Sequence, residues 1–197
     1  MILGIDVSTS ITGFSIFGDQ KLLHYGSIDL RKQDDLFDKA LILKEHLENY
    51  FEAYQLNNEG GWGDSDFPIT NIYIEQPLHM FMKGKSSANT ISKLMRFNGI
   101  VSYIVYDLFE IKPQYIAAST ARKECGIKIK RGEKAKEVVL KHTLNNEKAF
   151  KIEYTKFGNP KPESYDRADA IVIAKAGFLI EQKNTMNKHW HNFLTML

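Results

Sequence analysis

The chain has 197 residues, of which 43% are hydrophobic and 25% are charged, and its formal net charge is +2. This composition is typical of one folded domain with a real core, and it excludes extensive disorder. No apolar run approaches the length of a membrane span, the N-terminus lacks a signal-peptide pattern, and a single cysteine, Cys125, excludes an internal disulfide. We therefore expect a cytoplasmic protein without a membrane partner.

The N-terminal segment predicts three consecutive strands. Residues 1–8 form an apolar run, residues 12–18 follow a tight Ser/Thr turn, and residues 21–30 follow a second turn. Strands joined by such short turns form an antiparallel meander. Gly13 is expected to let the second strand approach a neighbouring element closely.

Helices and strands alternate in the remainder of the chain, which predicts a mixed α/β sheet of five strands flanked by helices. This domain is expected to span residues 1–185, with a C-terminal tail at 186–197. The expected elements are a helix capped by Asp34 or Asp35 and running through Phe51, a loop at 57–68, a strand at 70–75, an exposed loop at 78–87, a helix at 88–110, a strand at 114–118, a helix at about 132–145 and a helix from 164 to about 183.

The helix expected at 88–110 has apolar residues on more than one side. A helix of this kind must be covered on two sides. Its own sheet can cover one side, and a second subunit is our candidate for the other.

Charge is unevenly distributed along the chain. Residues 121–136 contain seven basic and two acidic side chains, whereas residues 31–66 contain four basic and nine acidic ones. This polarity favours one face for a polyanion such as nucleic acid, although charge runs are more often simply solvated surface.

Four acidic residues stand in or beside apolar segments. Asp6 lies in the first strand, Glu75 ends the fourth, and Asp166 and Asp169 begin the last helix. A carboxylate in an apolar segment loses hydration, and gathering several of them around divalent cations offsets that cost. Asp166 and Asp169 are three apart, so they share one helical face. Taken singly, Asp166 also fits a charge at a helix N-terminus, and Glu75 fits a solvated strand end.

Three blocks of sequence carry a family resemblance. They are residues 4–14 (Gly-Ile-Asp-Val-Ser-Thr-Ser-Ile-Thr-Gly-Phe), 74–76 (Ile-Glu-Gln) and 166–170 (Asp-Arg-Ala-Asp-Ala). In this order, with these elements between them, the chain from residue 2 to about 176 resembles the RuvC family of Holliday junction resolvases, within the RNase H-like (retroviral integrase) superfamily.

The resemblance implies an RNase H-like fold and a magnesium-dependent endodeoxyribonuclease that resolves four-way DNA junctions by paired symmetric nicks. Two Mg²⁺ ions would be held by Asp6, Glu75, Asp166 and Asp169, with Mn²⁺ as a substitute and no small-molecule cofactor. Hard oxygen ligands without Cys or His clusters agree with magnesium or manganese rather than zinc. A two-fold substrate that needs two nicks further implies a homodimer.

Other residues are candidates for DNA contacts. Plain turn chemistry explains the Ser8 and Thr9 hydroxyls equally well. Phe81 is displaced from the position where the RuvC family carries an aromatic residue that stacks at the junction centre, and ordinary packing is an even alternative to such a wedge role. The candidates are Ser8, Thr9, Gln76, Phe81, Lys83, Lys85, Arg122, Lys123, Lys130, Lys134 and Lys136, the basic ones contacting backbone phosphates.

Three alternative functions stay open at this stage. The first is a broader nuclease for flaps and forks, as in some phage-type relatives, in which case the compartment is the host cytoplasm. The second is an actin-like-fold phosphotransferase, which also opens with Gly-Ile-Asp, although 197 residues is short for its two lobes. The third is a catalytically inactive DNA-binding relative, against which the retention of all four acids argues.

Overall fold

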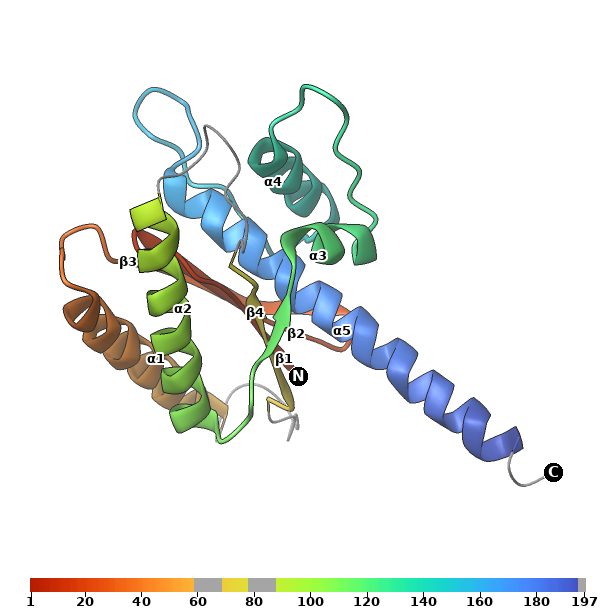
Figure 1. The fold of residues 1–197 in the computed structure, drawn as a ribbon. Helices are drawn as coiled ribbons and strands as arrows, with labels where there is room; N and C mark the ends of the chain where they lie inside the picture. Colours follow the sequence, from red (N-terminus) through yellow and green to blue (C-terminus); the bar gives the residue numbers. More distant parts are fainter. Residues whose placement is uncertain (59–68, 78–87, 195–197) are drawn as a thin grey trace.

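A computed structural model describes residues 1–58, 69–77 and 88–194 of the chain. These residues form a three-layer α/β structure in which helices cover both faces of a central sheet (Figure 1). The loops expected at 57–68 and 78–87 fall almost entirely outside the described residues. None of the helices in the described ranges is long and apolar enough to cross a lipid bilayer.

The sheet has five strands in the order β3-β2-β1-β4-β5. The strands β1 (Ile2–Asp6), β2 (Ile11–Gly18) and β3 (Lys21–Asp29) are antiparallel neighbours. The strands β4 (Asn71–Glu75) and β5 (Gln114–Ile116) then extend the sheet in parallel from β1. The predicted mixed sheet with three antiparallel strands first is confirmed.

Helices α1 (Leu36–Asn58) and α2 (Ala88–Phe109) cover one face of the sheet. Asp35 caps α1 as expected, because its Oδ1 accepts hydrogen bonds from the backbone N–H groups of Phe37 (2.7 Å) and Asp38 (3.3 Å). The core between these helices and the sheet is built from alternate strand residues, which point to one face of the sheet.

Helices α3 (Ala118–Glu124), α4 (Ala135–Asn146) and α5 (Pro162–Leu194) cover the opposite face. Three details differ from the sequence-based expectation. The short helix α3 lies between the strand expected at 114–118 and the helix expected from about 132, in a basic stretch where no helix was expected. Helix α4 begins three residues later than 132, and α5 continues well past 183. Seven residues of α3 give too short a window for periodicity, and polar residues continue α5 beyond the sheet, where no apolar pattern marks them.

Candidate active site

Asp6 and Glu75 meet at one edge of the sheet. The parallel strands β1 and β4 are paired with Ile5 opposite Ile74, so Asp6 and Glu75 lie side by side where the two strands end. Asp6 is only 9% exposed, and the nearby Glu75 raises its pKa. The pairing of β1 with β4 thus brings these two acids next to each other.

Helix α5 brings Asp166 and Asp169 to the same edge. Gly13 lies directly opposite Asp6 in the β1–β2 pairing, and a Cβ atom on Gly13 would come within 2.1 Å of the Asp166 carbonyl oxygen. Ser15 fixes the next turn of the helix, since its hydroxyl donates to the carbonyl of Ala170 at 2.9 Å. The close approach expected at Gly13 is confirmed, and its consequence is that α5 rests on β2 beside Asp6.

Burial disfavours negative charge on all four acids, and repulsion by the other site acids adds to this effect for Asp6 and Asp169. Loss of hydration is the main reason that the pKa of Asp6 lies well above its ordinary value, and the nearby Glu75 and Asp169 raise it further. Desolvation likewise raises the pKa of Glu75 and of Asp166, and it raises the pKa of Asp169 to about 7. The four carboxyl groups thus act on one another electrostatically, as a shared site requires.

Lys136 lies among these carboxylates. Its Nζ is 2.8 Å from Asp166 Oδ1 and 3.8 Å from Asp169 Oδ2. Its positive charge opposes the rise in pKa of Asp6, Glu75 and both of these aspartates. The ammonium side chain is 60% exposed, so it reaches the acids from the solvent side. In this structure an internal cation therefore balances part of the negative charge of the site.

The site fits a hard divalent cation in donor type and in charge. Its donors are carboxylates, and a cation between them would relieve the repulsion that raises their pKa values. Among the described residues, however, no three His, Cys, Asp or Glu side chains converge closely enough to form a ready-made metal site. The acids have gathered at one edge, but their side chains are not arranged as a finished cage.

The hydroxyl-rich turn after Asp6 is largely occupied by its own hydrogen bonds. The Thr12 hydroxyl donates to the Ser8 carbonyl at 3.0 Å, and the Ser8 hydroxyl accepts from the Ser10 backbone N–H at 3.2 Å. The Thr9 carbonyl accepts a hydrogen bond from the ammonium group of buried Lys39. Turn chemistry accounts for these contacts, and phosphate binding by Ser8 and Thr9 stays a prediction.

The basic candidates divide between the rim of the site and the exposed surface. Arg122 on α3 lowers the pKa of Glu75 and of Asp169 through its charge, so it lies near the acids, as Lys136 does. By contrast, the side chains of Lys123, Lys130 and Lys134 are exposed to solvent. Gln76 directly follows Glu75, and its backbone N–H donates to the Ile116 carbonyl at 2.9 Å. Phe81, Lys83 and Lys85 lie outside the described residues.

Sequence reasoning missed two groups that position the acids. Buried Asn98 on α2 donates from Nδ2 to the Glu75 carbonyl at 3.1 Å. Its only sequence signal was a polar residue within an apolar helical stretch. Arg167, between the two aspartates of α5, donates from Nε to Ser27 on β3 at 2.9 Å and from Nη1 to Glu153.

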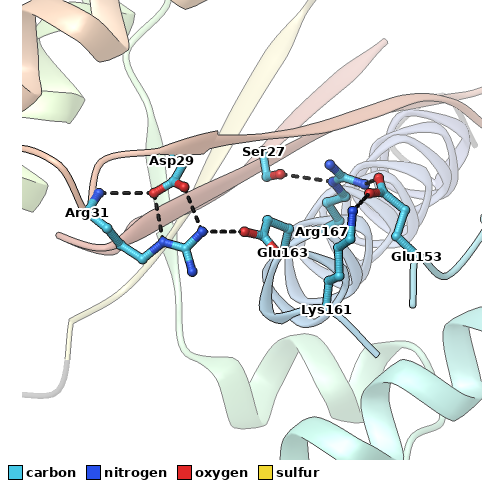
Figure 2. Close-up of polar contacts among 7 residues, drawn as sticks. All are labelled: Ser27, Asp29, Arg31, Glu153, Lys161, Glu163 and Arg167. Carbon is cyan, nitrogen blue, oxygen red and sulfur yellow. Dashed lines mark hydrogen bonds and ion pairs between the residues drawn. The ribbon is translucent and has the colours of Figure 1, made fainter. Parts of the chain in front are cut away.

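Figure 2 shows how the contacts of Arg167 and Arg31 attach the start of α5 to β3. Arg31 Nη2 lies 2.6 Å from Asp29 Oδ2 and 2.5 Å from Glu163 Oε1. The partners of Arg167 and Arg31 lie up to 140 residues away in the sequence, so no residue spacing predicts these contacts.

The chain is similar to known proteins in its fold. No protein-family model matches the sequence, and no curated protein matches it. Among solved structures, Thermus thermophilus RuvC in complex with a Holliday junction substrate is similar with a TM-score of 0.63 and 13% identity, covering 93% of this chain and 96% of that one.

A second Thermus thermophilus RuvC structure has a TM-score of 0.59 and 14% identity over the same shares of both chains. The yeast mitochondrial Holliday junction resolvase Ydc2 has a TM-score of 0.57 and 13% identity, covering 99% of this chain and 83% of that one. The chain therefore has the RuvC-like resolvase fold.

Proposed function

We propose that this chain, which has the RuvC-like fold, is a magnesium-dependent endonuclease that cuts four-way DNA junctions. The observation that carries the proposal is the convergence of Asp6, Glu75, Asp166 and Asp169 at one sheet edge, where desolvation raises the pKa of each of them. Divalent cations at such a site would favour the charged form of its acids, and a carboxylate-bound metal is what metal-assisted phosphodiester hydrolysis requires.

The four carboxylates would hold two Mg²⁺ ions, with Mn²⁺ as a substitute. When bound, such ions activate water and stabilise the leaving oxygen of an in-line displacement. The protein's own contribution is to fix the ligands. Asn98 holds the end of β4 at Glu75, while Gly13 and Ser15 hold α5 against β2.

Basic side chains around the acids would position the DNA. Arg122 and Lys136 are close enough to the carboxylates to act on their pKa values, and they would contact phosphates at the scissile strand. The exposed Lys123, Lys130 and Lys134 would bind phosphates farther along the arms. Phosphate contacts of this kind position a nucleic acid without reading its sequence, as recognition of a branch demands.

A homodimer is the assembly we propose for paired nicks. The outer side of α2 exposes Met95 (43%), Tyr103 (67%) and Tyr106 (42%), and Tyr115 on β5 is exposed beside it (52%). The Tyr115 hydroxyl donates to Ser102 on α2 at 2.8 Å, so these aromatic groups belong to one surface. Isologous pairing through this surface would cover the side of α2 that its own sheet leaves open. The protein would act in the cytoplasm, where the lone Cys125 stays reduced.

The test is cleavage of a synthetic four-way junction beside a matched duplex, flap and fork, in Mg²⁺, Mn²⁺ or EDTA. We expect paired symmetric nicks on the junction that EDTA abolishes. Equal cutting of flaps and forks would replace the proposal with a broader branched-DNA nuclease. Absence of cutting on every substrate would overturn it, and ATP turnover without DNA would favour a phosphotransferase.

A substitution at the site sharpens this test. Glu75→Gln removes a metal ligand and no phosphate contact, so cleavage should fall by at least about 100-fold while junction affinity is retained. Glu45→Gln, at an exposed position of α1, is the matched control and should cut as the wild type does. Loss of junction binding together with cleavage in Glu75→Gln would contradict the assignment of Glu75.

A further inference from the structure

A well-ordered hairpin, residues 153–161, immediately precedes α5. Its two sides are joined by backbone hydrogen bonds from Lys161 N–H to the Glu153 carbonyl (2.8 Å) and from Thr155 N–H to the Asn159 carbonyl (2.8 Å). The Thr155 hydroxyl oxygen accepts from the backbone N–H groups of Phe157 and Asn159, each at 3.3 Å. Gly158 supplies the left-handed backbone conformation, φ 78°, that closes the turn. This dense bonding defines one conformation for the tip.

The tip of the 153–161 hairpin presents an aromatic ring to solvent. Phe157 is 79% exposed, the largest exposed fraction among the large apolar side chains of the described residues. The Lys156 ammonium lies over the ring, 4.9 Å from its centroid, and Tyr154 on the same hairpin is 56% exposed. The Phe157 ring, the Lys156 ammonium and the Tyr154 ring are thus presented together on one hydrogen-bonded hairpin.

The base of the 153–161 hairpin is tied to the helix that carries the catalytic acids. Glu153 receives ion pairs from Lys161 (3.0 Å) and from Arg167, the residue that follows Asp166 (Figure 2). The Ser164 hydroxyl accepts from the Glu153 backbone N–H at 3.2 Å. Since a helix rises 1.5 Å per residue, the hairpin ends only about 6 Å along α5 from Asp166. The tip therefore has a set position relative to the site.

Charge around the 153–161 hairpin favours a polyanionic partner. Residues 148–161 contain four lysines and one glutamate, and that glutamate, Glu153, is already paired within the hairpin base. Three of the four lysines, Lys148, Lys151 and Lys156, are exposed. An exposed aromatic ring beside an ammonium group, on a segment rich in exposed lysines, is a combination that binds nucleic acids with unpaired or unstacked bases.

We propose that Phe157 stacks on an unstacked base at the branch point of the DNA, while Lys156 and its neighbours contact the adjoining phosphates. This inference rests on the proposed function and adds a DNA-binding element to it, separate from the predicted wedge Phe81. The 153–161 hairpin sets the position of the branch relative to the acids, and so selects the phosphate that reaches them.

The test uses the full-length protein in EDTA, so that DNA is bound and not cut. Binding is measured by fluorescence anisotropy on a four-way junction, a fork and a duplex, with 2-aminopurine at the branch point reporting unstacking. The variants are Phe157→Ala and Phe157→Tyr, with Phe37→Ala as the matched control, since Phe37 is 70% exposed on α1. Both positions are exposed, and the fold should tolerate all three substitutions.

We expect Phe157→Ala to weaken junction binding about 5- to 100-fold, the effect of losing one base–aromatic stack, and to abolish the 2-aminopurine signal. Duplex binding should be unchanged, and Phe157→Tyr and Phe37→Ala should resemble the wild type. Equal junction affinity and an equal 2-aminopurine signal in Phe157→Ala would overturn the inference. If the wild type binds fork and junction alike, the junction proposal fails, while a loss on both in Phe157→Ala still supports stacking. A protein-docking role for Phe157 would leave all DNA binding unchanged.

Discussion

Replacing Asp169 with asparagine should stabilise the metal-free protein while removing its activity. The pKa of Asp169 is raised from 3.8 to about 7, chiefly by desolvation. At about 1.36 kcal/mol per pH unit, this corresponds to an upper value of about 4 kcal/mol for keeping the group ionised in the fold. Asparagine keeps the shape without the charge, and we expect a gain of about 1–4 kcal/mol in the free energy of unfolding at pH 8. Asp169 also raises the pKa of Asp6, so part of this gain comes from the removal of its repulsion on Asp6.

The pH dependence gives this prediction its sign. Because the folded-state pKa lies above the unfolded one, protonated Asp169 stabilises the fold fully below about pH 4, and this contribution is lost as the pH rises through about 7. Asp169→Asn should therefore exceed the wild type in stability at pH 8 and approach it at pH 5.

The assay is urea unfolding in EDTA at both pH values, with Glu45→Gln as the control that changes neither. A gain of 1 kcal/mol would also raise the melting temperature by about 2–4 °C. Mg²⁺ should stabilise the wild type more than the variant. An Asp169→Asn protein no more stable than the wild type at pH 8 would refute the reasoning.

Three further substitutions test other parts of the structure. Lys136→Met removes the ammonium group that competes with the metal for Asp166 and Asp169. Calorimetry should therefore show Mn²⁺ binding about 2- to 5-fold tighter, which is within the free energy of an exposed ion pair. Weaker binding would contradict that competition. Gly13→Ala places a Cβ 2.1 Å from a backbone oxygen of α5. It should lower the free energy of unfolding in urea by about 1–3 kcal/mol and the cleavage rate by about 100-fold. Wild-type values of both would show that α5 can shift without consequence. If the proposed homodimer forms through α2, Tyr103→Glu should convert it to a monomer in analytical ultracentrifugation without lowering stability. An unchanged sedimentation coefficient would remove this surface from the interface.

Local pattern predicted most of the architecture. The apolar runs joined by short turns at the N-terminus predicted the antiparallel meander, and Asp35 marked the start of α1, because tight turns and helix caps are properties of short segments. The same reasoning failed for α3, which is too short to show a period. It also failed for the end of α5, where the helix leaves the sheet and no buried stripe remains to signal it.

For the site, the amino-acid sequence by itself predicted which four acids gather, because a carboxylate within an apolar segment loses hydration and is costly to bury without a partner. The tertiary structure alone decided what surrounds them. Lys136 against Asp166, Asn98 on the Glu75 carbonyl, and Arg167 joining β3 to the 153–161 hairpin all connect distant segments. Chain folding creates such pairs, since their energies depend on distance and burial in space and leave no period or spacing in the sequence.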